Sequence, residues 1–314
     1  MTLKISVVVD AHLRKEFVER AVRSALEQAP HEVILVKCYE DDVLDARMER
    51  MGVIVVSSKE PFQGGKFADG LKTATGDVVA FLDDDDVFLP GKIPRLQEEF
   101  GRDRVDVHVN RYVPFTSSVP VTSRLETSHV QNVQDPRGPN PGIASCESVR
   151  RDLMERWDAD LRKLVVADHA LFFMALVSGR RVSMDPSVLT GYHLVQTGNV
   201  QRTANTIWNR PGASSLQDVR WLLDFLDRYG EERPALKRLV TSAVVNLVFL
   251  TGTTDFPEGG RTVRALLDGV GIRRPLVVPS SLMFLYPFAP KMAIRLARTW
   301  KDLVGYHHAQ REWV

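Results

Sequence analysis

The sequence predicts an α/β protein whose sheet is mostly parallel and doubly wound, followed by a helical appendage at the C-terminal end. Three observations predict this class. Short apolar runs alternate with segments of helical periodicity in the first part of the chain, as in sheets with right-handed helical crossovers. Polar residues follow several of these runs, at the strand ends where such sheets bind ligands. Beyond about residue 210, the apolar residues keep helical spacing only.

Four strands and three helices are predicted before the first long polar segment. The strands are short apolar runs of the kind that is buried on both faces of a parallel sheet, at residues 5–9, 33–36, 53–56 and 78–82. Apolar residues at helical spacing predict helices over 15–28 and 42–50, and a glycine-led loop that enters a short helix over 64–75. Pro30 and Gly76 end the first and the third of these helices.

The second half of the predicted sheet domain is less regular. A strand is expected around 105–109, and a polar loop from 116 to 142 is long enough to suggest a functional segment. Helices are then expected over 147–164 and 168–177, and strands over 181–184 and 188–194. We place the domain boundary after residue 205, giving an α/β domain over 1–205 and a helical region over 206–314. The helices of that region are expected at 216–229, 234–250, 262–270 and 280–304.

Composition excludes several classes of protein. The chain has 314 residues, enough for a large α/β domain with an appendage, and its 44% hydrophobic and 26% charged residues fit a folded, soluble protein. A formal net charge of +1 gives no bulk field for DNA or RNA, so no nucleic-acid partner is expected. Cys38 and Cys146 are too few for a disulfide framework. No stretch of about 18 apolar residues predicts a spanning helix, and the first apolar run is too short for a signal peptide, so we expect a cytoplasmic chain.

Four consecutive aspartates, residues 83–86, follow the fourth predicted strand directly. Like charges this close raise each other's pKa and destabilise a fold unless a cation relieves them. Hard divalent cations such as Mg2+ or Mn2+ prefer carboxylate oxygens. In an extended segment, Asp83 and Asp85 point one way and Asp84 and Asp86 the other, so one pair can face a metal while the other caps the turn or binds ligand hydroxyls. The alternative is a solvated acidic turn.

The residues around this run resemble glycosyltransferase family 2. The family's Ala-x-Gly, apolar strand and Leu-Asp-x-Asp-Asp are matched by 74–86, and its downstream proline by Pro90. The first strand, the helix residues 23–28 and Gly70 also resemble the family's pattern, and the resemblance covers about residues 3–200. It implies the GT-A fold, a nucleotide-sugar donor and inversion at the anomeric carbon.

By this resemblance, Asp83 and Asp85 form an Asp-x-Asp motif that holds Mn2+ or Mg2+ against the donor diphosphate, with Asp84 also at the donor. The metal would stabilise the charge on the departing nucleoside diphosphate. We expect a UDP-sugar as donor. Lys66, in the glycine-led loop, is a candidate phosphate contact, and its alternative is an exposed lysine. His193, after the last predicted strand, is a candidate phosphate or metal ligand, and its alternative is a structural histidine.

An inverting transfer also needs a general base on the acceptor side. The family carries an acidic residue at the start of a downstream helix, and Asp168 stands at that place here. Asp168 would take the proton of the acceptor hydroxyl as its oxygen attacks the anomeric carbon. Asp is also a favoured N-cap, so Asp168 is alternatively the cap of its helix, or both.

The chain departs from the family at the nucleobase. Where the family has Pro-Thr-Tyr-Asn after its first strand, residues 10–13 are Asp-Ala-His-Leu, and His12 would take the stacking role of the tyrosine. Where the family has Asp-Asp-Gly-Ser after its second strand, residues 37–40 are Lys-Cys-Tyr-Glu, so Glu40 or Asp41 would replace the missing acidic contact. The altered residues leave open a second interpretation, a degenerate glycosyltransferase that binds nucleotide or serves as a scaffold without turnover.

The helical tail bears on the acceptor. Its last segment, 291–301, combines basic residues with apolar ones beside an aromatic stretch, a composition that can lie in a membrane interface. The alternative is ordinary packing against the catalytic domain or a second subunit, as in a homodimer. Contact with the cytoplasmic face of a membrane would favour a lipid-linked acceptor over a soluble glycan or polysaccharide.

Overall fold

The computed structural model describes residues 3–12, 14–102, 105–115, 143–178, 181–193, 213–230 and 240. Contacts divide the chain into two compact units, residues 1–198 and 199–314. In the first unit the elements are β1 (Ile5–Ala11), α1 (Lys15–Leu26), β2 (Glu32–Lys37), α2 (Asp42–Arg50), β3 (Ile54–Ser57), α3 (Gln63–Thr73), β4 (Val78–Asp83), β5 (Val87–Phe88), α4 (Lys92–Arg102), β6 (Val105–Phe115), η1 (Ala144–Cys146), β7 (Glu147–Arg150), α5 (Arg151–Glu155), α6 (Asp158–Leu161), α7 (Asp168–Val177) and β8 (Arg181–His193).

These strands form one eight-stranded sheet in the order β3-β2-β1-β4-β7-β6-β8-β5. β1 to β4 pair in parallel, as predicted, and β6 pairs in parallel with β8. β7 enters between β4 and β6 antiparallel to both, and β5 pairs antiparallel with β8. The predicted mixed α/β class with a mostly parallel sheet is therefore confirmed.

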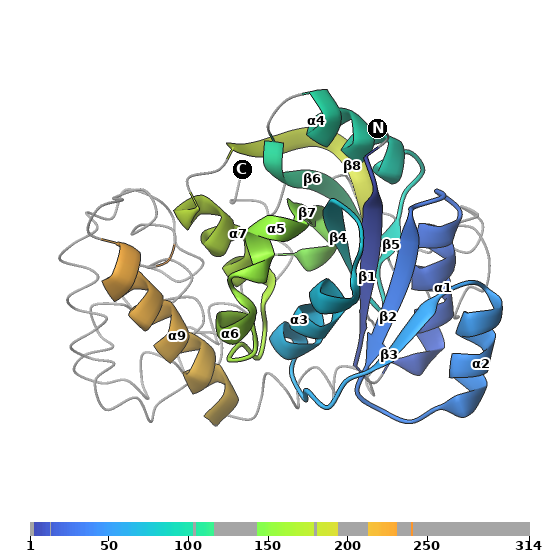
Figure 1. Cartoon of the computed structure of the whole chain (residues 1–314), viewed down its shortest axis with the longest axis horizontal. Coiled ribbons are helices and arrows are strands. Elements are labelled where there is room, and N and C mark those ends of the chain that lie inside the picture. Colours follow the sequence, from blue (N-terminus) through green and yellow to red (C-terminus); the bar gives the residue numbers. More distant parts are fainter. Residues whose placement is uncertain are drawn as a thin grey trace, which may run out of the picture. The chain divides into compact units, whose positions relative to one another are not determined.

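Helices cover both faces of β1, β2 and β4 (Figure 1). Alternate residues of β1 serve the two faces, because side chains on a strand alternate in direction. Val7 and Val9 belong to a core cluster with apolar residues of α1 and α4. On the other face, α3 packs closely against Val8, since a Cβ added to Gly70 would lie 2.4 Å from a methyl carbon of Val8. This packing gives a physical reason for glycine at the position of Gly70.

The register brings the predicted strand ends together. Asp10 lies beside Val36 on one side and beside Asp83 on the other, so β1, β2 and β4 end at one edge of the sheet. The acidic run therefore emerges next to the segment that follows β1. This is the edge at which parallel sheets bind ligands.

Two predicted elements differ in the structure. The helix expected over 147–164 is interrupted: its first residues form β7, and two short helices follow. β7 is a buried strand between β4 and β6, but its polar sequence does not show the apolar run by which buried strands are recognised. The two strands expected over 181–194 are one long strand, β8, whose pairing with β6 contains register shifts.

In the second unit, the structure describes one long helix, α9 (Ala213–Tyr229), where a helix over 216–229 was predicted. Apart from residue 240, the other predicted tail helices lie outside the described residues, as does the expected boundary after residue 205, and all of these remain predictions. No helix in the described segments is both long and apolar enough to cross a bilayer.

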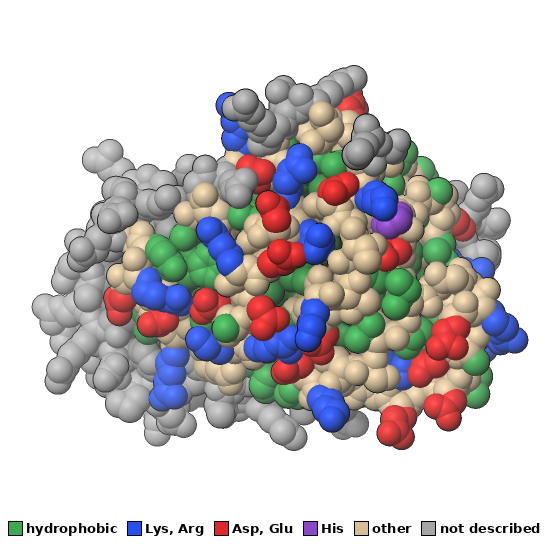
Figure 2. Space-filling view, viewed as in Figure 1, with side chains coloured by type: hydrophobic (Ala, Val, Ile, Leu, Met, Phe, Trp, Pro, Cys, Tyr) green, Lys and Arg blue, Asp and Glu red, His purple; other side chains and the backbone are tan. Residues whose placement is uncertain are grey.

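Charged side chains of both signs are interspersed over the described part of the face drawn in Figure 2. Several charged side chains of the first unit form ion pairs: Arg162 pairs with Glu60, Asp69 and Asp158, and Arg151 pairs with Glu155. Mixed charges of this kind agree with the small net charge of the chain.

Candidate active site

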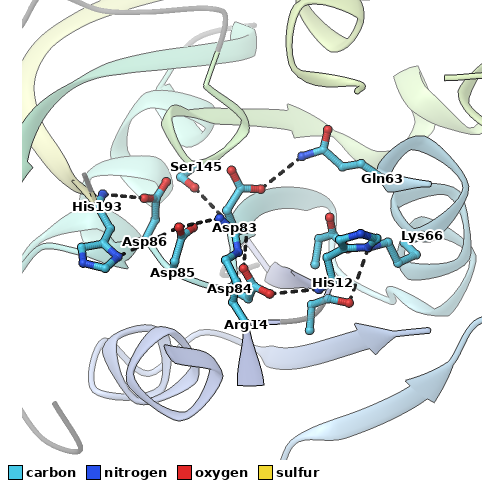
Figure 3. Close-up of polar contacts among 12 residues, drawn as sticks. His12, Arg14, Gln63, Lys66, Asp83, Asp84, Asp85, Asp86, Ser145 and His193 are labelled. Carbon is cyan, nitrogen blue, oxygen red and sulfur yellow. Dashed lines mark hydrogen bonds and ion pairs between the residues drawn. The ribbon is translucent and has the colours of Figure 1, made fainter. Parts of the chain in front are cut away.

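The four aspartates form the turn between β4 and β5, and their carboxylates contact groups from several other elements (Figure 3). Asp84 accepts a hydrogen bond from the backbone N–H of His12 at 2.9 Å, and Asp86 accepts one from the backbone N–H of His193 at 2.8 Å. These two side chains thus fasten the ends of β1 and β8 to the turn. Asp83 and Asp85 instead contact side chains from other elements.

Asp83 lies between α3 and η1. Its Oδ1 accepts a hydrogen bond from Gln63 Nε2 at 3.2 Å, and its backbone N–H donates to Ser145 Oγ at 3.0 Å. Burial raises the pKa of Asp83 well above its usual range, and the nearby carboxylates of Asp168 and Asp86 add to the shift. Asp83 is therefore a carboxylate that lacks sufficient positive charge around it.

Two arginines hold Asp85: Arg14, which precedes α1, and Arg20, which lies within it. Arg14 Nη1 lies 2.5 Å from Asp85 Oδ2, and Arg14 Nη2 lies 2.5 Å from Asp84 Oδ1. Arg20, which is buried, donates a hydrogen bond from Nη2 to the backbone oxygen of Asp85. The conformation of the turn thus depends on α1 as well as on the sheet.

Lys66 is buried rather than exposed, with only 1% of its side chain accessible. Its ammonium lies 2.6 Å from Asp10 Oδ1 and 3.4 Å from His12 Nδ1. Burial raises the pKa of Asp10, although Lys66 opposes that shift, and burial with the charge of Lys66 lowers the pKa of His12. Lys66 and His12 therefore lie together at the end of β1, with the ammonium already paired.

Asp168 is the first residue of α7, and Ala167 occupies the N-cap position without a side-chain cap. Its carboxylate takes hydrogen bonds from the Gln63 side chain and the Ala144 backbone. Among the described residues, its Oδ1 has no hydrogen-bond partner. Burial raises the pKa of Asp168 to about 7, partly opposed by the bond from Gln63.

Gln63 connects the two halves of the site. Its Nε2 donates to Asp83 while its Oε1 accepts from the Ala167 backbone N–H at 2.8 Å. Because Gln63 also bonds the Asp168 carboxylate, one side chain touches the acidic run and the start of α7. The structure therefore places Asp83 and Asp168 in the same site.

His193 ends β8 beside the run. Its Nδ1 lies 4.0 Å from Asp85 Oδ2, and its ring stacks on Phe115, with centroids 5.0 Å apart, and meets Phe17 edge-on. These ring contacts fix its position next to Asp85.

The segment after β2 does not provide a free acidic group at Asp41. Asp41 accepts a hydrogen bond from Leu44 N at 3.0 Å and pairs with Lys15, so it caps α2. Lys37, which stands where the family has aspartate, is buried and pairs with Asp45 at 2.9 Å. Glu40 is exposed between β2 and α2.

The carboxylates suit a hard divalent cation, although the protein alone does not surround one. Among the described residues, no group of three His, Cys, Asp or Glu side chains is arranged to hold a metal ion. Burial and neighbouring carboxylates nevertheless raise the pKa of Asp83 and Asp86, the latter to about 8, so ionising all of these carboxyl groups requires more positive charge than Arg14 supplies. Mg2+ is commonly held by one or two carboxylates with substrate phosphates completing its shell. Asp83 and Asp85 fit a metal that is bound together with a diphosphate.

Residues 6–160 match the sequence family described as "Glycosyl transferase family 2". Residues 6–160 therefore form a glycosyltransferase family 2 domain. A relative in Nostoc sp. (strain PCC 7120 / SAG 25.82 / UTEX 2576), named "Uncharacterized glycosyltransferase alr2836", is 35% identical over 107 residues. That match covers 31% of this chain and 33% of the relative, so the chain spans about a third of the relative's length.

Solved structures share the fold of this protein. S. aureus TarS 1-349 in complex with UDP-GlcNAc is similar with a TM-score of 0.60 at 16% identity, over 96% of this chain and 91% of that one. The same protein in complex with UDP gives a TM-score of 0.55 at 16% identity, over 96% and 90%. The GT-A fold implied by the sequence resemblance is confirmed.

Three residues of the family 2 site were not expected from the sequence: Arg14, Gln63 and Ser145. Arg14 follows a strand end where the family motif is altered, and that alteration was a signal that the local chemistry differs. Gln63 directly precedes the glycines of α3, so its place at a helix start was detectable but its partners were not. Ser145 had no signal, because only the packing of η1 on β4 brings it to Asp83.

Proposed function

We propose that the chain is an inverting, metal-dependent glycosyltransferase that moves a sugar from a nucleoside-diphosphate sugar to an acceptor hydroxyl. The observation that carries this proposal is the shared contact of Gln63 with Asp83 and Asp168. It joins a carboxylate suited to the donor metal with a carboxylate suited to a base. Family membership over residues 6–160 supports the reaction class.

On the donor side, Asp83 and Asp85 would hold Mn2+ or Mg2+, with His193 beside Asp85 as a further ligand. The bound ion would supply Lewis-acid stabilisation of the departing diphosphate. Asp84 and Asp86 orient the turn through the backbone N–H groups of His12 and His193. A UDP-sugar is the proposed donor, in keeping with the UDP-GlcNAc and UDP complexes of TarS.

On the acceptor side, Asp168 is the proposed base. As a carboxylate it takes the proton of the acceptor hydroxyl while that oxygen bonds to the anomeric carbon and the bond to the diphosphate oxygen breaks. Burial raises the pKa of Asp168 to about 7, so the group accepts a proton more readily than an ordinary aspartate yet is largely ionised above neutrality. Attack from the face opposite the leaving group inverts the anomeric centre.

For the nucleobase side, we propose His12 as the stacking residue and Glu40 as the exposed acidic contact. Asp41 is a weaker candidate, because it caps α2 and pairs with Lys15. Lys66 would position Asp10 and His12 beside the donor, since its ammonium is paired with Asp10 and lies near His12.

The acceptor remains a proposal of class: a glycan, a polysaccharide or a lipid-linked hydroxyl. We propose a cytoplasmic location, with peripheral membrane contact or a second subunit at the C-terminal helices. Apart from residue 240, these predicted helices over 234–304 lie outside the described residues.

Donor turnover tests this proposal directly. Purified protein with Mn2+ is offered UDP-, GDP- and dTDP-sugars, and release of nucleoside diphosphate is followed for wild type, Asp85→Asn and Asp168→Asn. Turnover that needs Mn2+ and is lost in both variants is expected. A thermal-shift series with UDP, GDP and dTDP then identifies the nucleobase that the protein prefers, because a ligand bound only by the folded state raises the Tm.

The alternative is a nucleotide-binding protein without turnover. One observation favours it: Lys37 pairs with Asp45 at the strand end where the family has an acidic residue that contacts the nucleobase. Metal-dependent binding of a diphosphate with no release from any nucleotide sugar would support this alternative and contradict the enzyme.

A further inference from the structure

Arg14 already supplies a cation at the place where the donor metal is proposed to bind. It precedes α1 at the N-cap position and points its guanidinium into the aspartate turn (Figure 3). Its two terminal nitrogens each lie 2.5 Å from a carboxylate oxygen, one of Asp84 and one of Asp85. Such paired contacts are the strong form of the arginine–carboxylate interaction.

The whole acidic run acts on this one guanidinium. Burial lowers the pKa of Arg14, but the charges of Asp84, Asp85, Asp83 and Asp86 outweigh it and hold that pKa well above its usual range. Other basic groups nearby are engaged differently. Lys66 pairs with Asp10, and Arg20 donates to the backbone oxygen of Asp85 rather than to its carboxylate.

A divalent cation on Asp85 would meet Arg14 at the same oxygen. The Oδ2 atom that Arg14 Nη1 contacts also lies 4.0 Å from His193 Nδ1. A guanidinium and a dication on one carboxylate repel each other, and burial strengthens that repulsion. Since Arg14 keeps 31% of its side chain exposed, it has solvent into which it can withdraw.

We propose that Arg14 is the resident cation of the aspartate turn and competes with the divalent metal for Asp85, so that it sets the metal affinity of the site. This inference rests on the proposed function only for the presence of a metal at Asp85. The cluster is arranged around Arg14, in agreement with the lack of any three-ligand metal group among the described residues.

Direct binding of Mn2+ tests this competition without any sugar or acceptor. Free Mn2+ is titrated against wild type, Arg14→Gln and Arg23→Gln, and the unbound ion is measured by electron paramagnetic resonance. Arg23→Gln is the matched control, because Arg23 lies on the same helix but pairs with Glu19. An opposite charge at this distance shifts carboxylate equilibria by about 1–3 powers of ten, so Arg14→Gln should bind Mn2+ at least about tenfold more tightly. Arg23→Gln should stay within about twofold of wild type, since exposed pairs contribute little.

Unchanged or weaker Mn2+ binding in Arg14→Gln would overturn the proposal, and so would a lack of binding in both proteins. Arg14→Lys keeps the charge but loses the paired contact, so its affinity should lie between wild type and Arg14→Gln. If Arg14→Gln does not fold, this variant decides: tighter binding than wild type supports the competition, and equal or weaker binding contradicts it. Nucleotide-sugar turnover is measured separately. Its absence would contradict the proposed function while leaving the metal competition intact.

Discussion

Burial gives Asp168 properties that a surface aspartate lacks. It lies at the first turn of α7 with one oxygen that accepts no hydrogen bond from the described residues, and its pKa is raised to about 7. The sign of the resulting pH dependence follows from its role. Asp168 can accept a proton only when its carboxyl group is ionised, so the fraction of active enzyme falls as the pH drops through the pKa of Asp168.

We therefore expect kcat to decline below about pH 7, with the midpoint at or below that value when a bound dication adds positive charge nearby. Asp168→Asn should lower kcat by about 10²–10⁴-fold while leaving diphosphate binding intact. The measurement is a pH–rate profile beside a binding titration. Asp152→Asn, at an exposed first-turn aspartate of α5, is the control and should behave as wild type. An unaltered profile in Asp168→Asn would assign the base to another residue.

At the scale of elements, the site is a junction of α3 with the segment that leads into α7. The N–H groups of Gln63 and Gly64 donate to the carbonyls of Val165 and Leu164, both at 3.3 Å. A Cβ added to Gly64 would lie 2.1 Å from the Leu161 carbonyl oxygen, so the backbones of the two segments pack directly against each other. Gln63 is thereby held where its amide reaches both Asp83 and Ala167.

Gln63→Met should remove this connection without introducing charge. We expect kcat to fall about 10-fold to 100-fold, because small displacements of a base cost this much. The affinity for Mn2+ with UDP should change by less than about threefold, since Asp83 and Asp85 remain. Gln28→Met is the matched control: Gln28 joins α1 to α4 through its amide, with bonds of 3.3 Å to Ser24 O and from Ile93 N. Equal losses of kcat in both variants would show a general packing effect instead.

Gly70 governs the seating of α3 on the sheet. A Cβ there would lie 2.4 Å from Val8 Cγ1 and 3.2 Å from Val36 Cγ2, in a layer that has no space to yield. Gly70→Ala should lower the free energy of unfolding by about 1–3 kcal/mol, the usual cost of overpacking. Gly101→Ala is the control, since a Cβ at Gly101 in α4 meets nothing within 4 Å. Its stability should be unchanged or rise by up to about 1 kcal/mol, and chemical denaturation measures both.

The sequence predicted the features that depend on local patterns and missed those that depend on tertiary contacts. The parallel strands β1 to β4 and the acidic turn followed from local patterns, because strands buried on both faces are continuous apolar runs. β7 did not, since its residues Glu-Ser-Val-Arg carry no strand pattern and only tertiary pairing with β4 and β6 makes them a strand. For the site, the aspartates were predictable as residues. Their partners Arg14 and Gln63 were not, because contacts between segments far apart in the sequence leave no spacing to detect.

For the molecule as a whole, the site gathers buried carboxyl groups whose ionisation destabilises the fold. Burial raises the pKa of Asp10, Asp83, Asp84, Asp86, Asp168 and Glu147. A carboxyl group whose pKa is raised by folding stabilises the fold while it is protonated. That contribution is complete below its unfolded pKa, near 4, and is lost as the pH rises through the folded value. The printed sequence has a formal net charge of only +1, so general charge repulsion does not obscure this effect near neutrality.

The metal-free protein should therefore lose thermal stability from about pH 4 up to about pH 8, because over this interval the unfolded chain has released the protons that Asp168 keeps until about pH 7 and Asp86 until about pH 8 in the folded state. Excess Mn2+ should raise the Tm most at the upper end of this range, because the ion binds the ionised carboxylates of the folded state. The slope of Tm against pH should become shallower with Mn2+, and also in Asp168→Asn, which has one buried group fewer to ionise. Differential scanning fluorimetry across this range measures both slopes. A Tm that rises with pH without metal, or a Mn2+ shift that is the same at pH 4 and pH 8, would show that the buried carboxylates do not govern the stability of this fold.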